Sequence, residues 1–535
     1  MKENGNGRAT GKSRANSGTL AKSVSLHLEG RRKEALDVLT EGIAAGESSA
    51  EVHAAAALIQ YELGLFDEAA ASYEKLLMLE PGHPNAYFNA AICYERTGHW
   101  REAAPRFRKA AEIDPSRLDA RVGTGICLLH LEQTEAALAE FDAVLAIEPG
   151  HPTALFGKGV AAQKLGRQDE AIAVYQAVLE RKPGSEECLG NLIALSLARN
   201  DYAAVEEYSE RLLTASPSSP AAVEGLAACA FAREDYEAAA RFSAKLTEAL
   251  PDKFENWFNL GVARQKLGLL AEAVVAYREA ARIRPEAREA WVNLGVACQS
   301  QGDLREARAA YEYALQISPD LTDVLFNLAS VVEQEESKDQ AEQLYTRLLQ
   351  KNPEMPEAWF RLGCLKLEKA DYPTAVDAFQ SCVDRRNHWP EAWVNLGLAC
   401  WNVGELDRAT EAFKLVLEQD PNPVDALRGL AAIAVERENY DDALDYQAKL
   451  IEAGERSAEL FYNTGLLLQK SGQVDDAIRL YKEALEEKPE FAEALLNLGH
   501  AMKEKGQPDE ARGYWKRALE VKPELGDGYY DRAAR

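Results

Sequence analysis

The chain has 535 residues, of which 47% are hydrophobic and 28% are charged. It can therefore bury a core, and the composition excludes a disordered protein. The net charge of −26 arises from 87 acidic and 61 basic residues, and such a field repels phosphate backbones. We expect no binding of nucleic acid. No run of about 18 apolar residues occurs, so we expect no insertion into a membrane.

The N-terminal segment, residues 1–15, is rich in glycine, asparagine and serine, and we predict a disordered tail there. It lacks the apolar stretch of a secretory signal. Part of it resembles a phosphate-binding loop, but Asn6 stands where that loop requires glycine. The eight cysteines form no Cys-x-x-Cys pair, which favours free thiols and a reducing compartment. We therefore expect a cytoplasmic protein without a metal site.

A 34-residue pattern begins at Asn16 and runs through residues 16–525 as fifteen repeats, without insertion or deletion. We name each repeat by its first residue and number its positions 1 to 34. Position 8 is small in fourteen repeats, position 20 is alanine in fourteen, and position 32 is proline in twelve. Three columns that stay in phase over this length indicate a repeat architecture.

Each repeat carries two runs of apolar residues at helical spacing, at positions 4, 7, 8 and 11 and at positions 20, 24 and 27. In repeat 288 the aromatic residues of these runs are Trp291 and Tyr311. Gly302 lies between the runs, where glycine accepts a left-handed cap, and Pro319 ends the second run. The pattern predicts an all-α chain of stacked helix-turn-helix repeats, because one pair cannot bury its apolar face alone.

These columns resemble those of the tetratricopeptide repeat (TPR) over residues 16–525. The resemblance implies a right-handed α-solenoid, a superhelix in which the first helix of each repeat lines a concave groove. Residues 526–535 would begin a further first helix, and we expect them to form a partial capping helix.

Three repeats depart from the pattern, because repeats 186, 220 and 424 carry their aromatic residue at position 23 instead of 24 (Tyr208, Phe242 and Tyr446). We expect their second helices to pack differently and the solenoid to bend or soften there. A longer echo also occurs: the segment around Asn293 recurs 102 residues later around Asn395, as if three repeats had been duplicated.

The resemblance places positions 2, 5, 6, 9 and 12–13 on the groove side. Asparagine occupies position 6 in eight repeats, although it is not favoured inside helices. A ladder of side-chain amides can pair with the backbone of an extended peptide, and this one is similar to the ladder of O-linked N-acetylglucosamine transferases. Alternatively, these amides hydrogen-bond between neighbouring repeats. The predicted groove residues are Asn259, Asn293, Asn327, Arg361, Asn395, Asn463 and Asn497, with the aromatic Phe258, Phe326 and Phe360 beside them.

Within this set, Arg361 carries a charge that could seat a carboxylate. The aromatic residues at position 5 are either anchors for a partner or are shielded by packing between repeats. Glutamate is frequent at position 2, where it either attracts basic groups of a partner or complements the helix dipole.

No catalytic motif is found, so we expect no enzyme and no cofactor. The sequence favours a scaffold or adaptor that binds basic or amphipathic segments of partner proteins in its groove. The alternative is a substrate-recognition arm that works with a separate O-GlcNAc-type glycosyltransferase. A helical-repeat RNA binder is disfavoured, because its groove would be basic.

Overall fold

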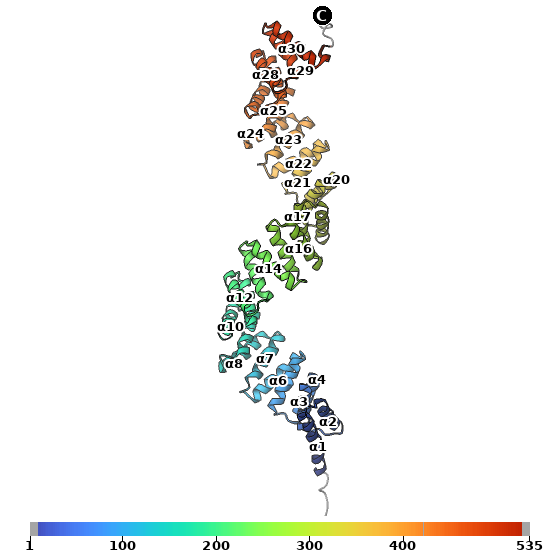
Figure 1. Ribbon diagram of the computed structural model, residues 1–535, viewed down its shortest axis with the longest axis vertical. Coiled ribbons are helices and arrows are strands. Elements are labelled where there is room, and N and C mark those ends of the chain that lie inside the picture. The colour runs from blue at the N-terminus through green and yellow to red at the C-terminus, as the bar shows by residue number, and fades with distance from the viewer. Residues whose placement is uncertain (1–8, 421, 527–535) are drawn as a thin grey trace, which may run out of the picture. The chain divides into compact units, whose positions relative to one another are not determined.

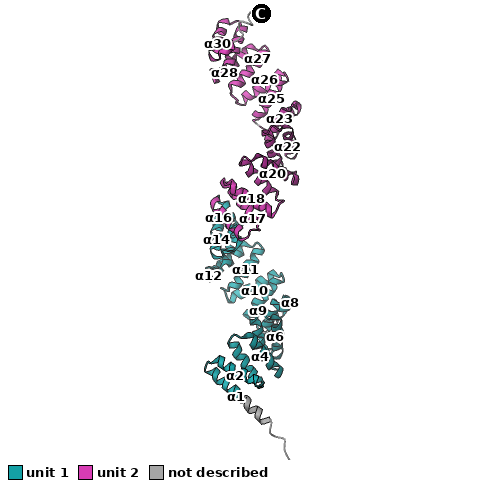
Figure 2. Ribbon diagram, turned by 90° about the vertical axis from the view of Figure 1, so that its right-hand side faces the viewer, with its two compact units in different colours: residues 1–269 teal, residues 270–535 magenta. Residues whose placement is uncertain are grey.

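The computed structural model describes residues 9–420 and 422–526, excluding the side chains of 9–17 and Pro84. This part of the chain forms 30 α-helices and one short 3₁₀ helix, and it contains no strand (Figure 1). The chain divides into two compact units, Met1–Leu269 and Leu270–Arg535, which are coloured separately in Figure 2 and described here one at a time. The all-α prediction and the helix-turn-helix period are confirmed.

Unit 1 contains seven complete helix pairs and the first helix of repeat 254. Its helices are α1 (Ala9–Leu28), α2 (Arg32–Ala44), α3 (Ala50–Glu62), α4 (Phe66–Leu79), α5 (Pro84–Arg96), α6 (Trp100–Ile113), α7 (Leu118–His130), α8 (Thr134–Ile147), α9 (Pro152–Lys164), α10 (Gln168–Arg181), α11 (Glu186–Ala198), α12 (Tyr202–Ala215), α13 (Pro220–Ala232), α14 (Tyr236–Ala249) and α15 (Phe254–Lys266).

Unit 2 begins with the second helix of repeat 254 and continues through repeat 492. Its helices are α16 (Leu270–Ile283), α17 (Arg288–Gln301), α18 (Leu304–Ile317), α19 (Thr322–Gln334), α20 (Lys338–Lys351), α21 (Pro356–Glu368), α22 (Tyr372–Arg385), α23 (Pro390–Val403), α24 (Leu406–Gln419), α25 (Val424–Glu436), α26 (Tyr440–Glu452), α27 (Ala458–Lys470), α28 (Val474–Glu487), α29 (Ala492–Glu504), α30 (Pro508–Val521) and η1 (Pro523–Gly526).

The two ends differ in how far they meet the sequence predictions. Helix α1 begins at Ala9, before the first residue of the repeat frame, so part of the predicted tail is helical. The rest of that tail, residues 1–8, lies outside the described residues. So does almost all of the predicted C-terminal cap, residues 527–535.

The turn inside every repeat requires a left-handed residue at position 15. All fifteen residues at this position have positive φ; nine are glycine, including Gly302 at 88°, and six are not. Glycine adopts this conformation without steric cost, whereas Ala370, at 57°, carries a Cβ that crowds the backbone. After Gly302, Asp303 caps the second helix by accepting a hydrogen bond from the backbone N–H of Glu306.

The small residue at position 8 is explained by the aromatic ring at position 24 of the same repeat. A Cβ added at Gly295 would lie 2.5 Å from the ring of Tyr311, which is fully buried. Gly363 lies in the same way against Phe379, where the distance would be 2.7 Å. Glycine at these two positions therefore lets the two helices of a repeat approach until the ring fills the space between them.

Tryptophan at position 4 ties a repeat to the preceding turn. The indole Nε1–H of Trp291 donates to the carbonyl of Pro285 over 2.8 Å, and that of Trp359 donates to the carbonyl of Pro353 over 2.8 Å. Each acceptor occupies position 32 of the repeat before. These bonds satisfy the indole while its ring stays half-buried.

The three irregular repeats replace the buried ring at position 24 with a polar residue. Ser209 and Ser243 are fully buried, and their hydroxyls have no hydrogen-bond partner among the described residues. The displaced ring of Tyr208 is also buried, and its hydroxyl accepts a hydrogen bond from Gln176 over 2.8 Å. An unpartnered buried hydroxyl costs free energy, so softening of the solenoid at these repeats stays a prediction with a physical cause.

Candidate protein-binding face

We define the first-helix face as positions 2, 5, 6 and 9 of the first helices, and its position-6 amides contact the preceding repeat. The Nδ2 group of Asn191 donates to the hydroxyl of Tyr175, at position 24 of repeat 152, over 3.1 Å. That hydroxyl donates in turn to Oε1 of Gln163 over 3.0 Å. Asn89 donates to Tyr73 in the same manner, over 3.3 Å. The amide therefore links neighbouring repeats.

The same pairing recurs inside unit 2. The amides of Asn293 and Asn327 contact the hydroxyls of Tyr277 and Tyr311, sixteen residues earlier. Burial raises the pKa of both phenols, and the amide, by donating to the oxygen, opposes that rise. Asn497 instead donates to the hydroxyl of Tyr462, over 2.9 Å.

Where position 24 is phenylalanine, position 6 of the next repeat is usually glycine. A Cβ at Gly157 would lie 2.4 Å from the ring of Phe141, and one at Gly429 would lie 2.5 Å from the ring of Phe413. Tyrosine thus pairs with an amide and phenylalanine with glycine. The pairing is visible in the sequence as a spacing of sixteen residues, which the reading of single columns missed.

Three of the predicted asparagines have no tyrosine opposite them. Position 24 of the preceding repeat is Ser243 before Asn259, Phe379 before Asn395, and Gln447 before Asn463. No hydrogen bond of these three amides is found within residues 9–420 and 422–526. Asn259 and Asn463 are exposed, and Asn395 is half-buried. We call these three residues the open amides.

Arg361 does not offer a free guanidinium. It forms a bidentate ion pair with Glu333 of the preceding repeat, with Nε–Oε2 and Nη2–Oε1 distances of 3.1 and 2.7 Å. Glu333 also accepts a hydrogen bond from the hydroxyl of Tyr345 over 3.0 Å. The carboxylate that Arg361 holds is therefore one of the chain's own, and Arg361 plays the linking part that asparagine plays elsewhere.

The predicted aromatic residues at position 5 are half-buried, since each packs on another ring of its own repeat. The ring of Phe326 lies 5.9 Å from that of Tyr345, and the ring of Phe360 lies 5.9 Å from that of Phe379. Phe258 stacks on Phe254 at 5.5 Å. The three rings are partly exposed and partly shielded by packing.

Two of the glutamates at position 2, Glu357 and Glu493, have cation partners that the sequence reading did not consider. Glu357 pairs with Arg386 at 3.3 Å, and Glu493 pairs with Lys522 at 2.8 Å; both cations occupy position 31 of the same repeat. The hydrogen bond from Lys522 holds the pKa of the Glu493 carboxyl below its usual value. Both glutamates form ion pairs within their own repeat, so most of their negative charge is compensated within the chain.

The described residues also lack two features. None of their helices is both long and apolar enough to cross a membrane. They contain no group of three or more histidine, cysteine, aspartate or glutamate side chains that could hold a metal ion.

The fold is thus that of a helical-repeat solenoid protein, and comparison with family models gives the type of repeat. A tetratricopeptide-repeat model matches residues 29–87, 54–116, 88–152, 131–186, 360–423 and 395–458, and a second one matches 468–533. The model of the TPR domain of cytochrome c-type biogenesis protein H matches residues 270–385. The repeats of this chain are tetratricopeptide repeats. None of the curated proteins matches the chain.

Solved structures resemble it only distantly. YrrB, described as a TPR protein with an unusual peptide-binding site, is 20% identical with a TM-score of 0.32, over 35% of this chain and 97% of YrrB. A chain of the APC/C hetero-tetramer Cut9–Hcn1 is 16% identical with a TM-score of 0.33, over 87% of this chain and 98% of its own. A TPR protein from Parabacteroides merdae ATCC 43184 is 16% identical with a TM-score of 0.34, over 46% and 98%. Likeness at this level carries no argument about function.

Proposed function

We propose that the protein is a non-enzymatic scaffold that binds extended or amphipathic segments of partner proteins on its first-helix face. The observation that carries this proposal is the set of open amides, Asn259, Asn395 and Asn463, which have no hydrogen bond within the described residues. Asparagine inside a helix is unfavourable, and at these three positions no tyrosine hydroxyl accounts for it. A peptide backbone offers the donor and acceptor that such an amide lacks.

The neighbouring side chains support the same function. Half-buried aromatic side chains at position 5, Phe258 and Tyr462, precede the open amides Asn259 and Asn463 directly in the sequence. Aromatic anchors next to hydrogen-bonding groups are typical of surfaces that hold peptide segments.

The test compares two matched triple variants of the full chain as baits. The first replaces the open amides by alanine, and the second replaces Asn89, Asn191 and Asn497, whose amides donate to tyrosine hydroxyls. Partners bound to the wild type, quantified by mass spectrometry, should be lost from the first variant and kept by the second. Equal partner lists from the wild type and the first variant would refute the proposal.

No observation favours the recognition-arm alternative over the scaffold, and it stays a prediction. The same experiment addresses it, because a glycosyltransferase among the proteins that the wild type retains would support it.

A further inference from the structure

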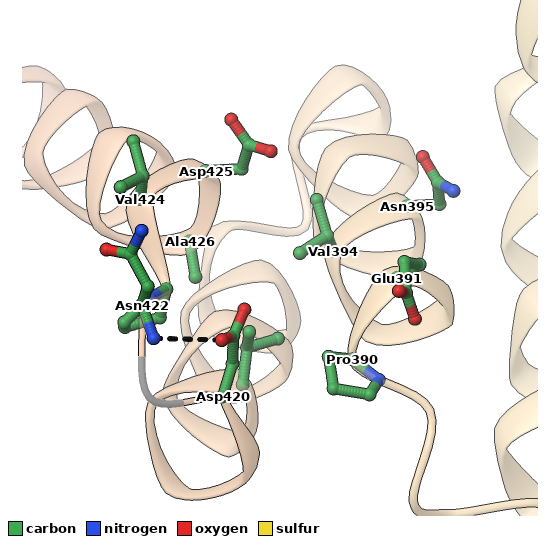
Figure 3. Close-up of a pocket in the computed structure, with 11 residues that line it drawn as sticks. Pro390, Glu391, Val394, Asn395, Asp420, Asn422, Val424, Asp425 and Ala426 are labelled. Carbon is green, nitrogen blue, oxygen red and sulfur yellow. Dashed lines mark hydrogen bonds between the residues drawn. The ribbon is translucent and has the colours of Figure 1, made fainter.

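A cavity of about 330 Å³ lies between the first helices α23 and α25, inside unit 2 (Figure 3). Val394, on α23, and Ala426, on α25, point into the space between the helices. Buried Val416 of α24 contributes to the apolar floor. The volume is at the small end of the range for ligand pockets, about 300–1,000 Å³.

Carboxylates and an amide surround this apolar floor. Glu391 and Asp420 have no ion-pair partner within the described part of the chain, and Asp420 accepts only the backbone N–H of Asn422, over 2.9 Å. Asp425 is 3.1 Å from Arg428, but both carboxylate oxygens of Glu455 also hold that guanidinium, at 2.7 Å. The rim therefore carries excess negative charge.

In two other repeats, 356 and 458, side chains of the chain itself occupy the equivalent space beside the glutamate at position 2. In repeat 356, Trp389 at position 34 stacks 4.6 Å from Phe360 at position 5. Arg386 at position 31 lies 4.7 Å above Trp389 and pairs with the position-2 glutamate, Glu357, at 3.3 Å. An apolar ring and a cation thus cover the position-2 carboxylate.

Repeat 458 repeats the arrangement with different residues. Phe491 lies 4.9 Å from Tyr462, and Lys488 lies 4.9 Å above Phe491 and 3.4 Å from Glu459. The residue types change, but the ring, the cation and the glutamate stay at the same four positions. In both repeats a cation at position 31 therefore covers the glutamate at position 2.

Repeat 390 has the glutamate at position 2, Glu391, but lacks both aromatic rings and the cation. Its position 5 is Val394, its position 34 is Pro423, and its position 31 is Asp420, an acid in place of the cation. The position-6 residue, Asn395, is one of the open amides and also lines the cavity. The result is an unfilled socket, with two uncompensated carboxylates where repeat 356 holds an arginine and repeat 458 a lysine.

We propose that this socket binds an arginine side chain from a partner protein. The apolar floor suits the methylene stem, and the separated carboxylates suit the spread N–H donors of a guanidinium. A metal ion fits poorly, because these carboxylates do not form a group close enough to hold one. The inference rests on the proposed scaffold function and names the chemistry that its face recognises.

The test measures saturation-transfer difference NMR on the full chain with N-acetyl-arginine amide as the probe and N-acetyl-citrulline amide as its neutral counterpart. The arginine probe should receive saturation from the wild type, and its signal should fall with added salt. Asp420→Arg, which restores the missing cation in the chain, should reduce the signal by roughly five-fold. Glu391→Gln should reduce it as well, and circular dichroism checks that both variants are folded.

Two variants serve as matched controls. Asp377→Arg makes the same change of charge at an exposed position of α22, outside the cavity, and Glu459→Gln removes a glutamate that already has Lys488. Both should keep the signal. Equal loss from Asp377→Arg and Asp420→Arg would show long-range charge alone and overturn the proposal. Equal signals from the arginine and citrulline probes, or complete displacement by millimolar Mg²⁺, would overturn it too.

The outcome is separable from that of the scaffold proposal. The open-amide variant keeps Glu391 and Asp420. Arginine binding that survives in this variant, while its partner list equals that of the wild type, would therefore reject the amide-based scaffold and keep the socket. Partner loss from that variant, combined with no arginine signal from the wild type, would reject the socket alone.

Discussion

The pairing of an amide at position 6 with a tyrosine hydroxyl in the preceding repeat can be measured as a coupling free energy. In the wild type, Asn191 donates to Tyr175 over 3.1 Å, and Tyr175 donates to Gln163 over 3.0 Å. Asn191→Ala removes one hydrogen bond, worth about 1 kcal/mol, and Tyr175→Phe removes two, worth about 2 kcal/mol. Because they share one bond, the double variant should cost about 1 kcal/mol less than the sum of the single variants.

The assay has to be local, since a long repeat array does not unfold as one two-state body. Hydrogen exchange followed by mass spectrometry, on peptides from α10 and α11 of the full chain, reports the opening of this joint. A loss of about 1 kcal/mol corresponds to exchange that is about five-fold faster. Asn463→Ala is the control, because no tyrosine faces this exposed amide, and its local exchange should change by less than about two-fold.

Additive effects of Asn191→Ala and Tyr175→Phe, within about 0.3 kcal/mol, would refute the linking role of the amide. Asparagine at position 6 would then need another explanation at every repeat, and the distinction between open and tyrosine-bound amides would lose its basis.

Two further predictions concern the turns and the thiols. Gly302→Ala, at φ 88°, should destabilise the α17–α18 pair by about 1–2 kcal/mol, whereas Gly513→Ala, in open space on α30, should be neutral or stabilising; differential scanning fluorimetry and local hydrogen exchange compare them. Burial raises the pKa of the Cys298 and Cys382 thiols to about 12, so at pH 8 they should be protonated and unreactive towards Ellman's reagent until the chain unfolds, when all eight cysteines should react. The folded state holds these thiol protons more tightly than the unfolded one, so stability should fall as the pH rises from about 9 towards 12; unfolding at lower urea concentration at pH 7 than at pH 10 would contradict this.

Much of the fold could be predicted because almost every repeat carries the same pattern, with a small residue at position 8, alanine at position 20 and proline at position 32. The structure confirms the helix ends that were predicted from Gly302 and Pro319. It also confirms the close approach of two helices that was predicted from the small residue Gly295. The helix at Ala9 was missed, because it begins before the frame that the repeated columns define.

The candidate site was predicted less completely, because contacts between repeats join residues that single columns keep apart. Arg361 was read as a free charge, although its partner, Glu333, lies 28 residues earlier in another repeat. The socket was not foreseen at all. Its carboxylates, Glu391 at the start of α23 and Asp420 at the end of α24, lie at opposite ends of one repeat, and only the packing of these two helices brings both to the same cavity.

The joints between repeats also constrain how such a chain can grow or shrink by whole repeats. Excision of residues 152–185 would place Phe141 before Asn191 and leave the amide without a hydroxyl, whereas excision of residues 288–321 would keep a tyrosine, Tyr277, before Asn327. A whole repeat can therefore be removed without loss of this hydrogen bond only where a tyrosine at position 24 still precedes an asparagine at position 6.

The three-repeat echo contains one joint that fails this rule. Asn395 is the counterpart of Asn293, but the counterpart of its tyrosine, Tyr277, is Phe379. Asn395 therefore has no tyrosine hydroxyl to bind, and it is the amide that lines the cavity between α23 and α25. Under the socket proposal, a mismatch between two similar repeats is a source of binding capacity in a repetitive protein.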